Sequence, residues 1–227
     1  MKVAIIWSRY GPYHLARFEG AADYGANHGF DVEGIEVARD DHVYEWDVNF
    51  GAESFVRHTL FPKSNYADLS GHQIRSKVFS LLEVIQPDAV AINGWAVPEA
   101  HGALAWCRRR NKNAILMTET KGDDAPRSWW KEWVKSRLLR RYSAALVGGR
   151  AQEAYLFELG FPVDKILSGY DIVDNYYFKD SAERARETAA ALRIKYRLPE
   201  KYFFASCRFI ARKNLASLLK AYAEYRI

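Results

Sequence analysis

Short apolar runs alternate with segments of helical periodicity along most of this chain, and that alternation constrains the fold more than any other feature. Val3 to Trp7 is apolar at every position, as in a strand covered on both faces. The chain predicts strands over 2–7, 32–37, 54–59, 89–93, 114–118 and 144–147, and helices over 13–28, 71–85, 98–110, 128–142 and 150–159. Strands separated by helices pair in parallel through right-handed crossovers. The sequence therefore predicts an α/β fold with a doubly wound, Rossmann-like parallel sheet.

The rhythm changes after residue 167. Residues 170–178 are typical of an extended connector, 202–206 of a new strand, and 215–225 of an amphipathic helix. One strand and one helix bury no core of their own, so we expect the chain to stop inside a second domain. The predicted organisation is a first Rossmann-like domain at 1–178, an interdomain helix and linker at 179–200, and a truncated second domain at 201–227, through which chains are expected to self-associate.

Composition limits the class of protein. Hydrophobic residues make up 49% of the chain and charges are mixed, which favours a globular protein. No apolar run approaches the ~20 residues that span a bilayer. The chain begins with a strand and so leaves no room for a signal peptide. Cys107 and Cys207 lack metal-ligand neighbours and indicate reduced thiols. We expect a cytoplasmic protein, free or at the inner membrane surface.

Several common functional motifs are missing. The chain contains no Walker loop, no G-x-G-x-x-G, no Ser-His-Asp order and no paired C-x-x-C. Their absence argues against an ATPase, a dehydrogenase, a nucleophile-elbow hydrolase and a zinc module. Asp123-Asp124 is interpreted as a solvated loop and no metal is expected. Aromatic residues fall mostly at core-facing positions, which argues against single-stranded nucleic acid as a partner.

Positive charge is concentrated in one part of the chain. Between Arg108 and Arg150 the sequence has twelve Lys or Arg against four Asp or Glu. Such a field suits an anionic partner: a nucleotide sugar, a phospholipid surface or a nucleic acid. Composition by itself does not choose among these partners.

A basic, Trp-rich segment lies within that region. On a helix over 128–142, Trp130, Val134, Leu138 and Tyr142 would form one stripe. We expect the stripe to pack on the sheet and the cations to face water. The alternative is a helix that lies on an anionic membrane surface.

The end of the chain carries a specific spacing. Cys207-Arg208-Phe209, three further residues and Lys213-Asn214 precede a Leu-rich helix. This arrangement resembles the first β-α unit of the donor domain in family 4 glycosyltransferases of the GT-B type. The resemblance implies that Arg208 and Lys213 bind the donor diphosphate, whose charge grows as the glycosidic bond breaks. It also implies a nucleotide sugar as substrate, retention at the anomeric carbon, and no metal or other cofactor.

Other segments agree with the same family. Gly11 lies in the turn where the family brings backbone N–H groups near the donor phosphates, and 167–175 resembles its interdomain connector. Ligands bind at the carboxyl ends of strands in open α/β sheets. By that rule the candidate catalytic residues are Glu119 and Asn93, and the candidate residues of the cleft or acceptor site are His14, Arg17, Trp95 and Lys121.

Departures from the family pattern keep alternatives open. Many members have His at the positions aligned with Glu119 and near Asn93, and Gly is common where this chain has Cys207 and Asn214. The Glu-x₇-Glu pair that holds the donor is absent. We predict a glycosyltransferase with an unidentified acceptor (a sugar, a polysaccharide or a lipid-linked molecule), inactive as this fragment. The alternatives are a non-catalytic binding module and a GT-B epimerase or phosphorylase.

Overall fold

A computed structural model describes residues 1–40 and 55–226. The chain divides into two compact units, Met1–Asp174 and Asn175–Ile227. The first position of the strand predicted at 54–59 lies outside the described residues.

The first unit contains a parallel sheet, which has seven strands within the described ranges. They are β1 (Lys2–Trp7), β2 (Asp31–Asp40), β3 (Arg57–Asn65), β4 (Ala89–Asn93), β5 (Asn113–Thr118), β6 (Ala144–Val147) and β7 (Ile166–Ser168). Their order is β3-β2-β1-β4-β5-β6-β7, with every pair parallel. The doubly wound fold predicted from the sequence is confirmed. The order reverses between β1 and β4.

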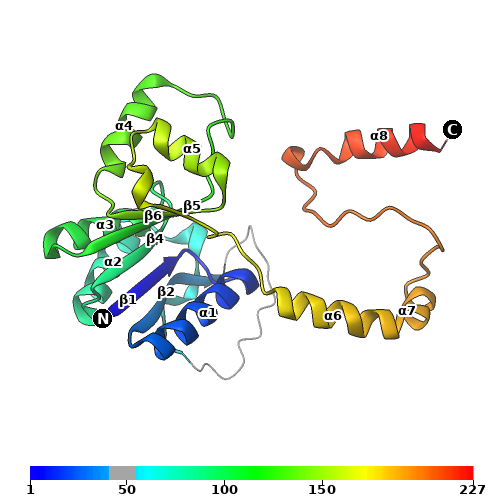
Figure 1. The fold of residues 1–227 in the computed structure, drawn as a ribbon, viewed down its shortest axis with the longest axis horizontal. Coiled ribbons are helices and arrows are strands. Elements are labelled where there is room, and N and C mark those ends of the chain that lie inside the picture. Colours follow the sequence, from blue (N-terminus) through cyan, green and yellow to red (C-terminus); the bar gives the residue numbers. More distant parts are fainter. Residues whose placement is uncertain (41–54, 227) are drawn as a thin grey trace. The chain divides into compact units, whose positions relative to one another are not determined.

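Helices cover both faces of the sheet (Figure 1). They are α1 (Pro12–His28), α2 (Gly71–Ile85), α3 (Pro98–Arg110), α4 (Trp129–Leu139) and α5 (Arg150–Glu158). Phe18 and Ala22 of α1 belong to one buried cluster, and the buried residues of α2 to α5 belong to another. In α2 the buried Ile74, Val78 and Leu82 recur at a spacing of four, which places one apolar stripe on the sheet.

Helices α2 and α3 pack closely because Gly102 has no side chain. A Cβ built on Gly102 would lie 2.8 Å from the carbonyl oxygen of Arg75 and 3.0 Å from its Cα. These are backbone atoms of α2, which cannot give way as a flexible side chain would. The glycine therefore sets the separation of the two helices.

Two strands differ from the prediction. β3 runs over nine residues where a short strand was expected, and β7 was not predicted. Both lie at the ends of the strand order. In β3, Pro62, Lys63 and Ser64 bulge opposite a single residue of β2, because Ala38 pairs with Phe61 and Asp40 with Asn65. Proline lacks the N–H that a regular ladder needs. A strand that continues through Pro62 is therefore not expected from the sequence.

The expected packing of the stripe on α4 is wrong for its first half. Leu138 packs on the core and Tyr142 is buried, but Trp130 and Val134 are 52% and 49% exposed. The apolar surface of the sheet is already covered near this point by α3 and α5, whose Trp106 and Leu156 are fully buried. The first half of α4 therefore faces outward.

The second unit contains α6 (Asn175–Glu187), α7 (Ala189–Lys195) and α8 (Leu215–Tyr225). The strand predicted at 202–206 is wrong, because no strand forms there. A lone strand has no neighbour to satisfy its backbone groups and is not stable by itself. The interdomain helix predicted within 179–200 is interrupted at Thr188, and α6 begins within the predicted extended connector.

Candidate functional site at the carboxyl edge of the sheet

A short segment after β7 crosses the carboxyl edge of the sheet. The Tyr170 N–H donates to the carbonyl of Val147 at the end of β6, at 3.1 Å. The Tyr170 hydroxyl accepts a hydrogen bond from Trp7 Nε1 at the end of β1, at 2.9 Å. This segment, 169–172, thus connects the far side of the sheet with the strand next to the reversal of the order.

Arg17 of α1 holds the crossing segment in place. Its Nε donates to the carbonyl of Ile172 at 2.8 Å, and its guanidinium forms an ion pair with Asp171. The guanidinium also lies over the Tyr170 ring, 5.2 Å from the centroid. The Arg17 side chain is only 10% exposed and that of Asp171 is 48% exposed, so the ion pair joins a buried guanidinium to a carboxylate that water still reaches.

His14 lies one turn before Arg17 and faces the end of β1. Its ring is 5.1 Å from that of Trp7. Burial, with a contribution from the Arg17 charge, lowers the pKa of His14 to about 4, so the ring is neutral at pH 7. The Gly11 N–H donates to its Nδ1 at 3.2 Å, so the proton of the neutral ring resides on Nε2. His14 can therefore donate from Nε2 to an oxygen of a ligand.

Glu119 follows directly after β5 and interacts electrostatically with Arg17 and Asp171. Burial and the nearby charge of Asp171 raise the pKa of Glu119, and the Arg17 guanidinium opposes the shift. Its backbone carbonyl accepts from Gln152 Nε2 at 3.2 Å, which fixes the loop. Three residues distant in sequence, Arg17, Glu119 and Asp171, thus form one polar cluster at the carboxyl edge. A carboxyl group of raised pKa is suited to proton transfer.

The remaining candidates from the first unit lie outside this cluster. Asn93 ends β4 and is half-buried; no described residue bonds its side chain. Trp95 packs on the core cluster of α2 to α5, and its carbonyl contacts His101 Nε2 at 3.0 Å. The Lys121 ammonium pairs with Asp123 at 2.9 Å.

The donor-site candidates belong to the second unit. Arg208 precedes a 3₁₀ turn over Ala211–Lys213, and Lys213 ends that turn just before α8. The Lys213 N–H donates to the carbonyl of Ile210 at 2.9 Å. Both cations are exposed and belong to one loop.

Sequence reasoning missed two buried carboxylates near the end of β1. Glu99, in the first turn of α3, accepts from the hydroxyls of Ser8 and of Tyr66, the latter at 2.9 Å. Glu36 accepts from the Tyr10 N–H at 3.2 Å and also bonds Thr59. Both are fully buried. Their signal is a carboxylate inside an otherwise apolar strand or helix face, which implies a bonded partner.

Two other kinds of feature are absent from the described residues. Within 1–40 and 55–226, no group of three or more His, Cys, Asp or Glu side chains has an arrangement able to bind a metal ion. In the same ranges, none of the helices combines the length and the apolar content that crossing a bilayer requires.

No family model and no curated protein matches the chain. Solved structures are similar in fold. The UDP-N-acetylglucosamine 2-epimerase from Rickettsia bellii is 13% identical with a TM-score of 0.53, over 88% of this chain and 52% of that one. The Neisseria meningitidis UDP-GlcNAc 2-epimerase bound to UDP-GlcNAc is 13% identical with a TM-score of 0.54, over 89% and 54%. Anabaena HepE in complex with UDP and glucose is 12% identical with a TM-score of 0.55, over 84% and 51%.

The chain spans about half the length of these proteins. At such identities the likeness concerns the fold alone. The comparison establishes that this chain has the Rossmann-like α/β architecture of these structures, which include two UDP-N-acetylglucosamine 2-epimerases and a protein in complex with UDP and glucose.

Proposed function

We propose that this chain forms part of a GT-B enzyme that acts on a nucleotide sugar, and that the enzyme is a glycosyltransferase of family 4 type. The observation that carries the proposal is the cluster of Arg17, Glu119 and Asp171 at the carboxyl edge. Open parallel sheets bind ligands outside this edge, next to the reversal of the strand order. The likeness in fold to proteins with bound UDP or UDP-GlcNAc supports the same class.

The first unit is the proposed acceptor side. In a transfer, an acceptor hydroxyl bonds to the anomeric carbon, the bond from that carbon to the diphosphate breaks, and the hydroxyl proton passes to an oxygen of the departing diphosphate. Glu119 is suited to orient that hydroxyl or to steady positive charge on the sugar, because it stands at the carboxyl edge and its pKa is raised by burial and by the charge of Asp171. His14 would donate from Nε2 to a sugar or phosphate oxygen without adding charge.

Arg208 and Lys213 are the proposed ligands of the donor diphosphate. Their basis is the spacing in the sequence and their position in one loop before α8. Charge on a departing diphosphate is greatest in the transition state, so cations that contact it lower the barrier more than they strengthen binding.

The test uses the complete product of the gene that encodes these residues. The purified protein is incubated with a panel of UDP, GDP and ADP sugars and candidate acceptors, and nucleoside diphosphate release and glycosylated product are measured. Arg208→Ala or Lys213→Ala should each lower kcat/KM by roughly 30- to 1000-fold, equivalent to about 2–4 kcal/mol. Lys220→Ala, another exposed cation of this unit, is the matched control and should leave the rate unchanged.

The alternative is a GT-B epimerase, which two of the similar structures favour. An epimerase changes the configuration of a sugar carbon and needs no acceptor, which NMR of the sugar product detects directly. Turnover to an epimer without an acceptor would refute transfer. Normal rates in the folded Arg208 and Lys213 variants would refute their proposed role.

A further inference from the structure

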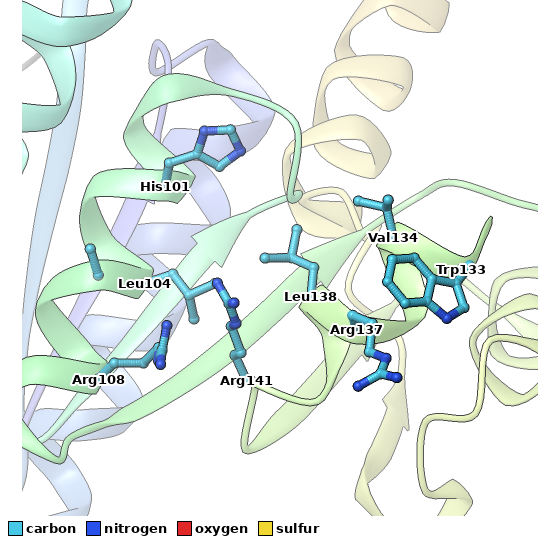
Figure 2. Close-up of a pocket in the computed structure, with 9 residues that line it drawn as sticks. His101, Leu104, Arg108, Trp133, Val134, Arg137, Leu138 and Arg141 are labelled. Carbon is cyan, nitrogen blue, oxygen red and sulfur yellow. The ribbon is translucent and has the colours of Figure 1, made fainter. Parts of the chain in front are cut away.

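An open hollow lies between α3 and α4 (Figure 2), and none of its lining residues belongs to the carboxyl-edge cluster. Its volume is about 450 Å³. The apolar side chains of Leu104, Val134 and Leu138 line it, and Arg108, Arg137 and Arg141 stand around it. No carboxylate is among its lining residues. The hollow therefore combines an apolar lining with three arginines and no opposing carboxylate.

Exposed tryptophans continue this surface along α4. Trp129, Trp130 and Trp133 are 83%, 52% and 57% exposed. Water is a poor environment for so much aromatic surface on one short helix, and contiguous exposed apolar patches mark interaction sites. The indole ring is amphipathic and is enriched where a bilayer meets water.

The arginines of this surface are not neutralised by carboxylates, and the Arg137 guanidinium lies over the Trp133 ring, 5.0 Å from its centroid. Within the described parts of the chain, Arg108, Arg137, Arg140 and Arg141 form no ion pair. The one carboxylate of α4, Glu132, is instead engaged by Lys135, by Tyr155 and by Arg127. The free charge on this side is therefore positive.

We propose that this surface, formed by α4 and the hollow beside α3, binds an anionic phospholipid membrane. The three tryptophans would lie at the headgroup level, the arginines would contact phosphates, and the hollow would accept the upper part of an acyl chain. Charge complementarity selects this occupant over a neutral bilayer. An acidic protein would match the charge but would leave the indoles without the wet, half-apolar boundary that suits them. The inference does not depend on the proposed function.

The experiment measures binding of the full chain to vesicles. One set contains phosphatidylcholine alone, and the other contains equal parts of phosphatidylcholine and phosphatidylglycerol. Co-sedimentation gives the partition coefficient, and brominated lipid reports insertion by quenching. Among the described tryptophans, Trp7 and Trp106 are buried and Trp95 half-buried, so of these side chains those of α4 would be quenched. We expect binding to the anionic vesicles only, weakening with salt.

Two variants separate the contributions. Arg137→Gln with Arg141→Gln should weaken binding by roughly 25-fold, about fivefold for each cation removed from an anionic surface. Trp129→Ala with Trp130→Ala should lower quenching, because Trp133 then remains as the exposed tryptophan of α4. The matched controls are Lys77→Gln with Lys165→Gln, which remove the same charge from exposed positions elsewhere in the unit, and Tyr24→Ala with Val84→Ala, which remove exposed apolar groups of α1 and α2.

The outcomes discriminate clearly. Binding lost in the α4 variants and retained in the controls supports the proposal. Equal affinity for neutral vesicles, equal losses in both sets of variants, or no vesicle binding would overturn it. Self-association in sedimentation that the tryptophan variants abolish, without vesicle binding, would also overturn it and assign the surface to a second copy of the chain.

Discussion

His14 couples the stability of the first unit to pH. Its folded pKa is about 4 against an ordinary value of 6.5. Between pH 6.5 and pH 4 this histidine is protonated in the unfolded chain but neutral in the folded chain. The free energy of unfolding therefore falls as the pH falls through this window, and above it His14 has no effect on stability. The full difference corresponds to about 3 kcal/mol, which partial exposure of the ring reduces to about 2 kcal/mol.

The measurement is urea unfolding of the wild type and of His14→Gln from pH 7.5 to pH 4.5. Glutamine at this position still accepts the hydrogen bond of the Gly11 N–H but does not titrate. The wild type should lose about 2 kcal/mol more than the variant on acidification. Parallel pH profiles would contradict a buried, neutral His14.

The two cysteines should differ sharply in reactivity. Burial raises the pKa of the Cys107 thiol to about 12, whereas Cys207 is exposed. Because the thiolate is the nucleophile, iodoacetamide at pH 8 should alkylate Cys207 and spare Cys107 until the protein is unfolded. Mass spectrometry of peptides from native and urea-treated samples checks this. Equal labelling of both thiols in the native sample would show that the α3 core opens readily.

The residues of the site could be predicted only in part from the sequence. His14, Arg17 and Glu119 stand next to predicted strand ends, so the topology rule identifies them. Tyr170 and Asp171 belong to a segment that returns across the sheet, and such a tertiary path leaves no periodic signal. Trp95 follows a strand end just as Glu119 does, yet its side chain packs on the core. The topology rule predicts which edge of the sheet binds a ligand but not the direction in which each side chain points.

At the scale of elements, the packing of α2 on α3 can be tested with two glycines. Gly102→Ala places a Cβ 2.8 Å from the Arg75 carbonyl, and overpacking of this kind costs about 1–3 kcal/mol. Gly20→Ala, at an open position of α1 with no atom within 4 Å of the new Cβ, should instead stabilise by about 0.5–1 kcal/mol. Opposite shifts in Tm are expected. A neutral Gly102→Ala would mean that the two helices can separate without loss.

Most elements were predictable because local pattern and tertiary environment agree. β1, β4 and β5 each contain an unbroken apolar run of at least four residues and lie inside the sheet, and α2 carries its buried residues on one stripe. The failures lie where the environment overrides the pattern. Residues 202–206 have the composition of a strand but pair with no neighbouring strand. β7 has only three residues, and it forms because it pairs with β6, about twenty residues earlier in the chain.

At the scale of the whole molecule, the two units should differ in stability. The second unit has no buried residue among those described, and in α8 Leu218 and Leu219 are 50% and 67% exposed. Phe203 contacts the rings of Tyr222 and Tyr225, which is little apolar burial for a segment of this length. Backbone hydrogen bonds that are shielded by so few buried apolar groups break readily through local unfolding.

Hydrogen exchange tests this difference. In a sample shown to be monomeric by sedimentation, amides of 202–226 should exchange within seconds, while those of β4 and α3 should be protected to the level of global unfolding. Association of chains would slow exchange in α8 as concentration rises. Slow exchange in α8 of a dilute monomer would show that the second unit has a core of its own.

The two outermost strands bear on how this protein would aggregate. β7 is three residues long, and β3 is interrupted by the bulge at Pro62 and Lys63. A proline, a lysine, a bulge and a very short strand are each features that keep a sheet from pairing with another chain. The sheet therefore offers a poor template for fibrillar growth. Precipitation at high concentration would proceed instead through exposed side chains such as those of α4 and α8. Added arginine or mild detergent should dissolve such a precipitate, whereas neither would dissolve an aggregate held by paired strands.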